Sequence, residues 1–121
     1  MAAVSYRDLT VWQKAMDLSV EVYRLSASFP RDERFGLTAQ VRRAATSVPA
    51  NVAEGNARGT RKDYAHFVSI ARGSLAETET FILLTVRLGY VNDGRVAPAL
   101  ELANEVGRML NALRSRLTDA S

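Results

Sequence analysis

A proline in the middle of a helical pattern is the feature that most limits how this chain can fold. Pro49 interrupts a segment in which apolar residues recur every three or four positions. A proline inside a helix removes one backbone hydrogen bond and clashes with the preceding turn, which costs about 3 kcal/mol or more. Polar residues and a glycine surround it: Ser47, Asn51, Glu54 and Gly55. The run 47–55 is therefore either a helix boundary or a kink with a polar purpose.

Helical periodicity extends over almost the whole sequence. It predicts helices at about residues 8–27, 34–54, 61–88 and 95–117, and no segment alternates as a strand would. Thr60, followed by Asp63, is typical of a helix N-cap, and Gly89 is typical of the residue just after a helix. The connections are short, and the last segment keeps heptad spacing, which favours near-parallel helix packing. We therefore predict an all-α, antiparallel up-down-up-down four-helix bundle over residues 1–121, one domain, with the second helix kinked near Pro49.

Two of these segments carry more apolar surface than a bundle needs. The first and third predicted helices each show two adjacent apolar stripes, whereas packing in a bundle requires one. Surplus apolar surface on a protein usually marks an interface. The sequence therefore predicts a homo-oligomer.

The charge of the chain is concentrated in its middle. The formal net charge is +3, with 16 basic and 13 acidic residues. Residues 31–72 hold eight basic residues against four acidic ones. Basic residues near the start of a helix oppose its dipole, and a bound anion would relieve this. The candidate nucleic-acid contacts are Arg42, Arg43, Arg58, Arg61 and Lys62. The alternative is that these residues form an ordinary solvated face.

Three residues of the third predicted helix need a reason for their positions. Glu77 lies in an apolar stripe. Its carboxylate is either at the edge of the stripe, in water, or in a buried ion pair with Arg42 or Arg43 that fixes the register of the helices. Gly73 and Ser74 lie in mid-helix, where glycine costs about 1 kcal/mol relative to alanine. We expect these two small residues to let a neighbouring helix approach closely, in preference to contacting a ligand.

Several classes of chemistry find no support in the sequence. The chain has no cysteine and one histidine, which argues against a thiolate site, a catalytic triad or a di-metal site. No phosphate-binding or nucleophile motif is present. We therefore expect no enzyme activity, no metal and no cofactor. No signal peptide or apolar run long enough to cross a bilayer is visible, so a cytoplasmic location without membrane contact is expected.

The chain resembles the four-helix-bundle family named for open reading frames in intervening sequences of the bacterial 23S ribosomal RNA gene. The matching stretches cover nearly the whole chain: DLxVWQKA at 8–15, FPxxExFGLTxQ at 29–40, RRAAxSVPxNVAEG at 42–55, IARGSLxE at 70–77 and LGY at 88–90. The motif residues within them are Ser47, Pro49, Asn51, Glu54, Gly55, Gly73, Ser74 and Glu77.

The resemblance implies an all-α fold and a homopentameric ring. The chain is also similar to the accessory protein of diversity-generating retroelements, a pentameric bundle that contacts reverse transcriptase and nucleic acid. Two functions of different class follow. The chain is either a non-catalytic binder of RNA or DNA, or a structural module that interacts with proteins such as a reverse transcriptase and does not bind nucleic acid directly.

Overall fold

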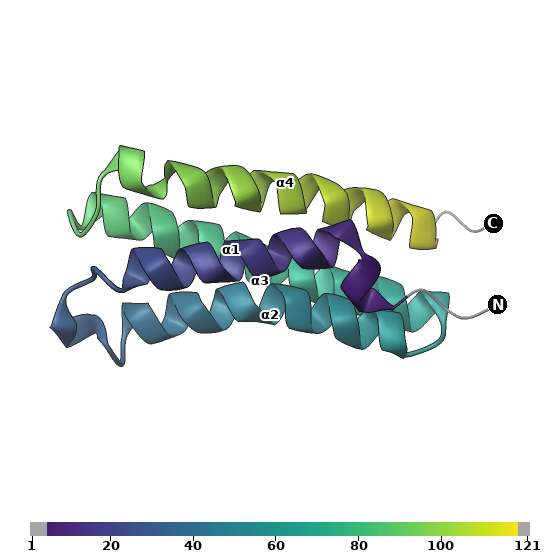
Figure 1. Ribbon diagram of the computed structural model, residues 1–121. Helices are drawn as coiled ribbons and strands as arrows, with labels where there is room; N and C mark the ends of the chain where they lie inside the picture. Colours follow the sequence, from purple (N-terminus) through teal and green to yellow (C-terminus); the bar gives the residue numbers. More distant parts are fainter. Residues whose placement is uncertain (1–4, 119–121) are drawn as a thin grey trace.

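Four long helices make up the computed structural model, which describes residues 5–118. They are α1 (Thr10–Ser26), α2 (Leu37–Ala57), α3 (Arg61–Arg87) and α4 (Asp93–Thr118), with short 3-10 helices η1 (Tyr6–Asp8) and η2 (Arg31–Glu33). The described part of the chain contains no strand, so the predicted all-α four-helix fold is confirmed. In Figure 1 η1 and the last turns of α4 lie at the same end as the α2–α3 connection, and the other two connections lie at the opposite end.

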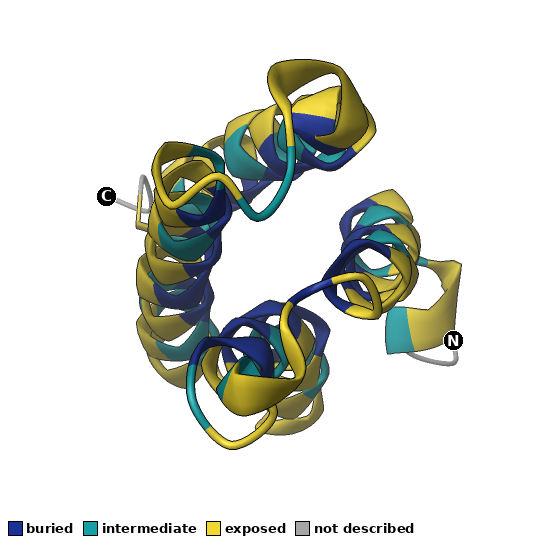
Figure 2. Ribbon diagram, turned by 90° about the vertical axis from the view of Figure 1, so that its left-hand side faces the viewer, coloured by how far each residue is buried: buried dark blue, intermediate teal, exposed yellow. Residues whose placement is uncertain are grey.

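The helices form a four-cornered arrangement around one core. α1 packs against α2 and α4, and α3 packs against the same two helices, so α1 and α3 occupy opposite corners. Figure 2 shows the buried residues on the inward sides of the helices. The heptad positions of α4 are buried as expected: Val96, Ala99, Ala103, Val106, Leu110 and Leu113. They join valines, leucines and alanines from the other three helices in a single apolar cluster.

Helix ends follow local sequence signals. The Thr60 hydroxyl accepts a hydrogen bond from the Asp63 amide at 3.1 Å, which confirms the predicted N-cap of α3. Gly89 has a φ of +78°, and the amides of Gly89 and Tyr90 bond the carbonyls of Val86 and Thr85. This is the Schellman arrangement that left-handed glycine permits after a helix.

Helix α2 continues past its predicted end. It runs through Pro49 and Gly55 to Ala57, so the run 47–55 is not a helix boundary. A Cβ atom at Gly55 would lie 2.8 Å from Phe67 Cβ, so the missing side chain lets α2 stay in close contact with α3. The kink near Pro49 stays a prediction.

The proline is accommodated by a serine from the neighbouring helix. Pro49 has no amide hydrogen, so the carbonyl of Ala45, four residues earlier, lacks its helical donor. The Ser19 hydroxyl of α1 shares its hydrogen between that carbonyl, at 3.2 Å, and the Ala15 carbonyl of α1, at 3.1 Å. Ser19 and Ala45 are buried, where an unpaired carbonyl would be costly. Sequence reasoning missed Ser19 because its role depends on a contact between helices.

Candidate nucleic-acid interface

Basic side chains gather at the end of the bundle that carries the α2–α3 connection. Arg58, Arg61 and Lys62, three of the five candidate contacts, lie on this connection and on the first turn of α3. All three are exposed. They are close in sequence, which is why the pattern of charges was enough to group them.

The fold adds three further arginines to this group. Arg114 and Arg116 lie in the last turns of α4, and η1, which carries Arg7, packs against α2 near the same end (Figure 1). We call the six residues the basic end: Arg7, Arg58, Arg61, Lys62, Arg114 and Arg116. Three carboxylates lie on the same segments, those of Asp8, Glu54 and Asp63, so this end has an excess of positive charge. Sequence reasoning missed these arginines because only the bundle topology brings their segments to the end that carries the α2–α3 connection.

Several guanidinium groups of the basic end are held in place by contacts. The Arg61 side chain donates to the Arg116 carbonyl and so links α3 to α4. Arg58 pairs with Glu54 at 3.0 Å and lies over the Phe67 ring, 4.9 Å from its centroid. An exposed ion pair of this kind is worth only about 0–1 kcal/mol, so a phosphate can compete for Arg58. The structure therefore fixes cations at this end and leaves them accessible.

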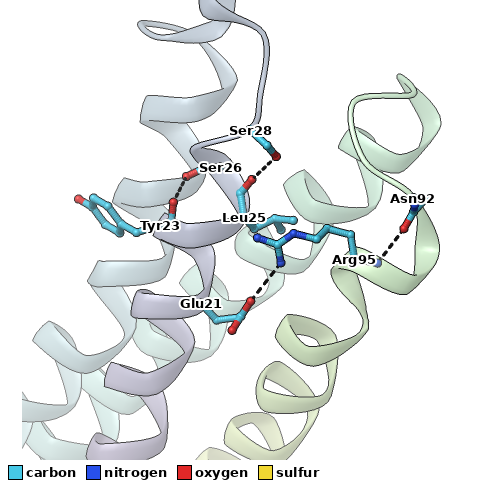
Figure 3. Close-up of polar contacts among 7 residues, drawn as sticks. All are labelled: Glu21, Tyr23, Leu25, Ser26, Ser28, Asn92 and Arg95. Carbon is cyan, nitrogen blue, oxygen red and sulfur yellow. Dashed lines mark hydrogen bonds and ion pairs between the residues drawn. The ribbon is translucent and has the colours of Figure 1, made fainter.

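Two of the candidate contacts lie elsewhere. Arg42 and Arg43 are in the first half of α2, and the 16 residues from Arg42 to Arg58 correspond to about 24 Å of helix. The Arg42 guanidinium donates to Ser26 Oγ at 2.8 Å and lies 4.4 Å from the Tyr23 ring centroid. Figure 3 shows that Tyr23 and Ser26 lie near the C-terminus of α1, where free carbonyls attract a cation. Arg42 therefore stabilises a helix end, and only Arg43 of the two is fully exposed.

An ion pair and a helix cap stabilise the end of the bundle opposite the basic end. Arg95 of α4 pairs with Glu21 of α1 at 3.3 Å, and the Arg95 amide bonds Asn92 Oδ1 at 2.8 Å (Figure 3). Nearby, the Tyr90 hydroxyl donates to Glu33 Oε2 at 2.7 Å, and the Leu37 amide donates to Glu33 Oε1 at 3.0 Å. These two hydrogen bonds lower the pKa of Glu33, and the bond to Glu33 raises the pKa of Tyr90.

The polar motif residues meet between α2 and α3. Ser47 Oγ and Ser74 Oγ are 2.9 Å apart, and the Asn51 amide nitrogen donates to both the hydroxyl and the carbonyl of Ser47. Ser74 is buried and Ser47 is half-buried, so this network joins the two helices where α2 and α3 meet. The prediction that Ser74 lies at a helix contact is confirmed.

The structure decides between the two alternatives for Glu77 and contradicts the expectation for Gly73. Glu77 is exposed and forms no ion pair within the described residues, so the buried Arg–Glu pair does not exist, and the alternative of a carboxylate at the stripe's edge holds. Gly73 is also exposed, and a Cβ atom built there would meet nothing within 4 Å. Gly73 therefore does not serve packing between the helices of this chain. Gly55 does serve such packing.

The surplus apolar stripe of α1 lies on the surface. Met16, Val20 and Tyr23 are 42%, 48% and 47% exposed. With Trp12 of α1 and a row of small residues on α2, they line an open apolar groove of about 540 Å³; the α2 residues are Pro49, Ala50 and Ala53. The second stripe of α3 is likewise exposed at Ile70, Leu84 and Leu88. Each helix thus keeps one apolar face outside the core.

Two other features are absent from residues 5–118. No cluster of three histidine, aspartate or glutamate side chains is arranged to hold a metal ion there. None of the helices in that range is sufficiently long and apolar to span a bilayer.

Comparison with known proteins identifies the family of the chain. No curated protein matches the sequence. A crystal structure of a protein of unknown function from the S23 ribosomal protein family, from Bacteroides thetaiotaomicron, superposes with a TM-score of 0.78 at 22% identity, covering 87% of this chain and 98% of that one. At that identity the likeness shows the fold alone. The family model described as 23S rRNA-intervening sequence protein matches residues 7–112. The chain belongs to the 23S rRNA-intervening sequence protein family.

Proposed function

We propose that this chain is a non-catalytic, homo-oligomeric bundle that binds RNA, or another nucleic acid, through its basic end. The observation that carries the proposal is the gathering of six basic side chains, from η1, the α2–α3 connection and the end of α4, against three carboxylates on the same segments within residues 5–118. Arginine guanidinium groups match phosphate geometry, and the first turn of α3 adds the positive end of a helix dipole. The name of the family, which refers to 23S rRNA, agrees with RNA as the ligand.

Contacts of this kind would recognise the backbone and not the bases. The cations of the basic end are spread over separate segments, η1, the α2–α3 connection and the end of α4. Phosphate contacts position a nucleic acid but carry no sequence information directly. We therefore expect affinity that depends strongly on salt and weakly on sequence.

Self-association is the second part of the proposal. The exposed apolar faces of α1 and α3 lie at opposite corners of the bundle and differ in composition. Two unlike surfaces that bind each other give a head-to-tail contact, which closes into a ring when the rotation allows. A homopentamer is the ring that the resemblance implies. Each added subunit would also add a basic end to the surface available to a polyanion.

The apolar groove between α1 and α2 favours a second candidate function. Its lining is almost entirely hydrophobic, so a protein partner suits it better than a nucleic acid does. In this alternative the chain is an interaction module, for example an accessory subunit of a reverse transcriptase, and its arginines serve salt bridges. The two functions differ in whether the purified chain binds RNA.

A pair of charge-matched double variants tests the proposal. Lys62→Gln with Arg116→Gln removes two cations from the basic end, and Arg31→Gln with Arg87→Gln removes two exposed cations from the opposite end. None of these four side chains forms an ion pair within the described residues. Two exposed ion contacts at about 0.5–1 kcal/mol each predict roughly a tenfold loss of affinity for structured RNA in the first variant only. Equal affinity of both variants for RNA would refute the nucleic-acid proposal and favour the interaction-module alternative.

A further inference from the structure

A groove between α2 and α3, with a lining that is part polar and part apolar, is separate from both the basic end and the apolar groove. It has a volume of about 300 Å³, at the lower end of the range for small-molecule sites. Its lining combines a guanidinium group, a carboxylate, a carboxamide, two hydroxyls and an aromatic ring. These belong to Arg43, Glu77, Gln40, Ser47, Ser74 and Phe81.

The register of the two helices places these groups in levels. Ser47 of α2 touches Ser74 of α3, and nearer the termini Gly55 of α2 closely approaches Phe67 of α3. Moving backward along α2 therefore corresponds to moving forward along α3. One turn from the serine pair, Arg43 faces Glu77 across the groove. One further turn places Gln40 opposite Phe81.

Opposite charges face each other in this groove without closing on each other. Neither Arg43 nor Glu77 forms an ion pair within 4 Å in residues 5–118, and both are exposed at the groove's edges. A guanidinium group and a carboxylate held on two packed helices present one binding position for an anion and one for a cation. A ligand that satisfies both must carry both charges a few bonds apart.

The serine pair supplies a further donor. Ser47 Oγ accepts from the Asn51 amide, and a single hydroxyl hydrogen lies between Ser47 Oγ and Ser74 Oγ. Two hydroxyls carry two hydrogens, so the second has no acceptor among the hydrogen bonds of the described residues. That hydrogen and the Arg43 guanidinium can both donate to one carboxylate. On the α3 side, Glu77 can accept from an ammonium group.

We propose that this groove binds a free α-amino acid. Its carboxylate is held by Arg43 and the serine pair, its ammonium by Glu77, and its side chain lies toward Gln40 and Phe81. This inference goes beyond the proposed nucleic-acid function and does not depend on it, because none of these residues belongs to the basic end. It requires the groove, which opens on the same side of α3 as the exposed Ile70 and Leu84, to stay open between the subunits of the proposed oligomer.

The test is titration calorimetry of the full chain with each of the twenty standard L-amino acids, up to 10 mM. We expect saturable binding of at least one. We also expect the matching amine without a carboxylate and the matching acid without an ammonium to bind at least tenfold more weakly, since each lacks one charge. Binding by no amino acid, or equal binding of the amino acid and either analogue, would overturn the proposal.

Variants assign the two binding positions. Arg43→Gln and Glu77→Gln should each reduce affinity for the amino acid at least tenfold, whereas Arg108→Gln and Glu101→Gln, exposed changes on α4, should leave it unchanged. Thermal unfolding of each variant shows that the bundle persists. A pair of groove variants that bind as the parent does, or control variants that weaken binding equally, would place the ligand outside this groove and refute the assignment.

Discussion

The hydrogen bond from Ser19 to the Ala45 carbonyl should be needed only because residue 49 is proline. Ser19→Ala leaves that carbonyl without a donor in a buried position. An unsatisfied buried group costs about 1–3 kcal/mol. In a Pro49→Ala background the amide of residue 49 can donate to the same carbonyl. The loss of the Ser19 hydroxyl should then cost at least about 1 kcal/mol less than it costs in the parent chain. The two substitutions should therefore be coupled by about 1–2 kcal/mol.

A double-mutant cycle measures this coupling directly. Urea unfolding followed by far-UV circular dichroism gives the free energy of unfolding of the parent, both single variants and the double variant, at one fixed protein concentration because association shifts apparent stability. Ser26→Ala serves as the control. Its hydroxyl bonds the Tyr23 carbonyl and accepts from Arg42, about two turns of α2 away from Pro49, so its effect should add to that of Pro49→Ala within about 0.5 kcal/mol. Additive free energies in the Ser19 cycle would refute the reasoning.

Three further outcomes follow from single side chains. Gly55→Ala should lower the free energy of unfolding by about 1–3 kcal/mol, because its Cβ would lie 2.8 Å from an α3 side chain. Gly73→Ala, at an exposed position, should raise the free energy of unfolding by up to about 1 kcal/mol. Urea unfolding of the two variants checks both signs. The hydrogen bond from the Tyr90 hydroxyl lowers the pKa of Glu33 in the folded chain. The stability that this shift contributes is complete above the unfolded pKa of about 4.3 and is lost as pH falls through the folded pKa. Glu33→Gln should therefore flatten the acid side of the profile of unfolding free energy measured from about pH 6 to pH 3. Val20→Glu places a charge in the exposed apolar groove and should dissociate the proposed oligomer without unfolding the chain, as sedimentation velocity would show. An unchanged mass would exclude this face from the interface.

Periodicity in the sequence predicted the helices and the core because burial in a bundle repeats every three to four residues. The buried positions of α4, the Thr60 cap and the left-handed Gly89 all followed from local signals. Local signals could not tell which of two apolar stripes on α1 would face the core. The stripe containing Leu18 and Val22 is buried, and the one containing Met16 and Val20 lines the surface groove.

Contacts between helices decided what the sequence could not. Gly55 and Gly73 are equivalent as residues in helices, and only the position of α3 shows that one is required for packing and the other lies open to solvent. Arg42 and Arg58 belong to one charged stretch of sequence, yet a helix separates them by about 24 Å. Arg116 is distant in sequence from Arg61 and lies beside it only because α4 returns to the same end.

The central claim is that the basic end contacts phosphate. The salt dependence of RNA affinity tests it most directly, because each phosphate contact contributes about −0.9 to the slope of log affinity against log salt concentration. We expect a steep negative slope for the parent chain, and a slope less steep by about two per chain bound for Lys62→Gln with Arg116→Gln. The control pair Arg31→Gln with Arg87→Gln should keep the parent slope. An identical slope in the parent and in the basic-end variant would contradict the account.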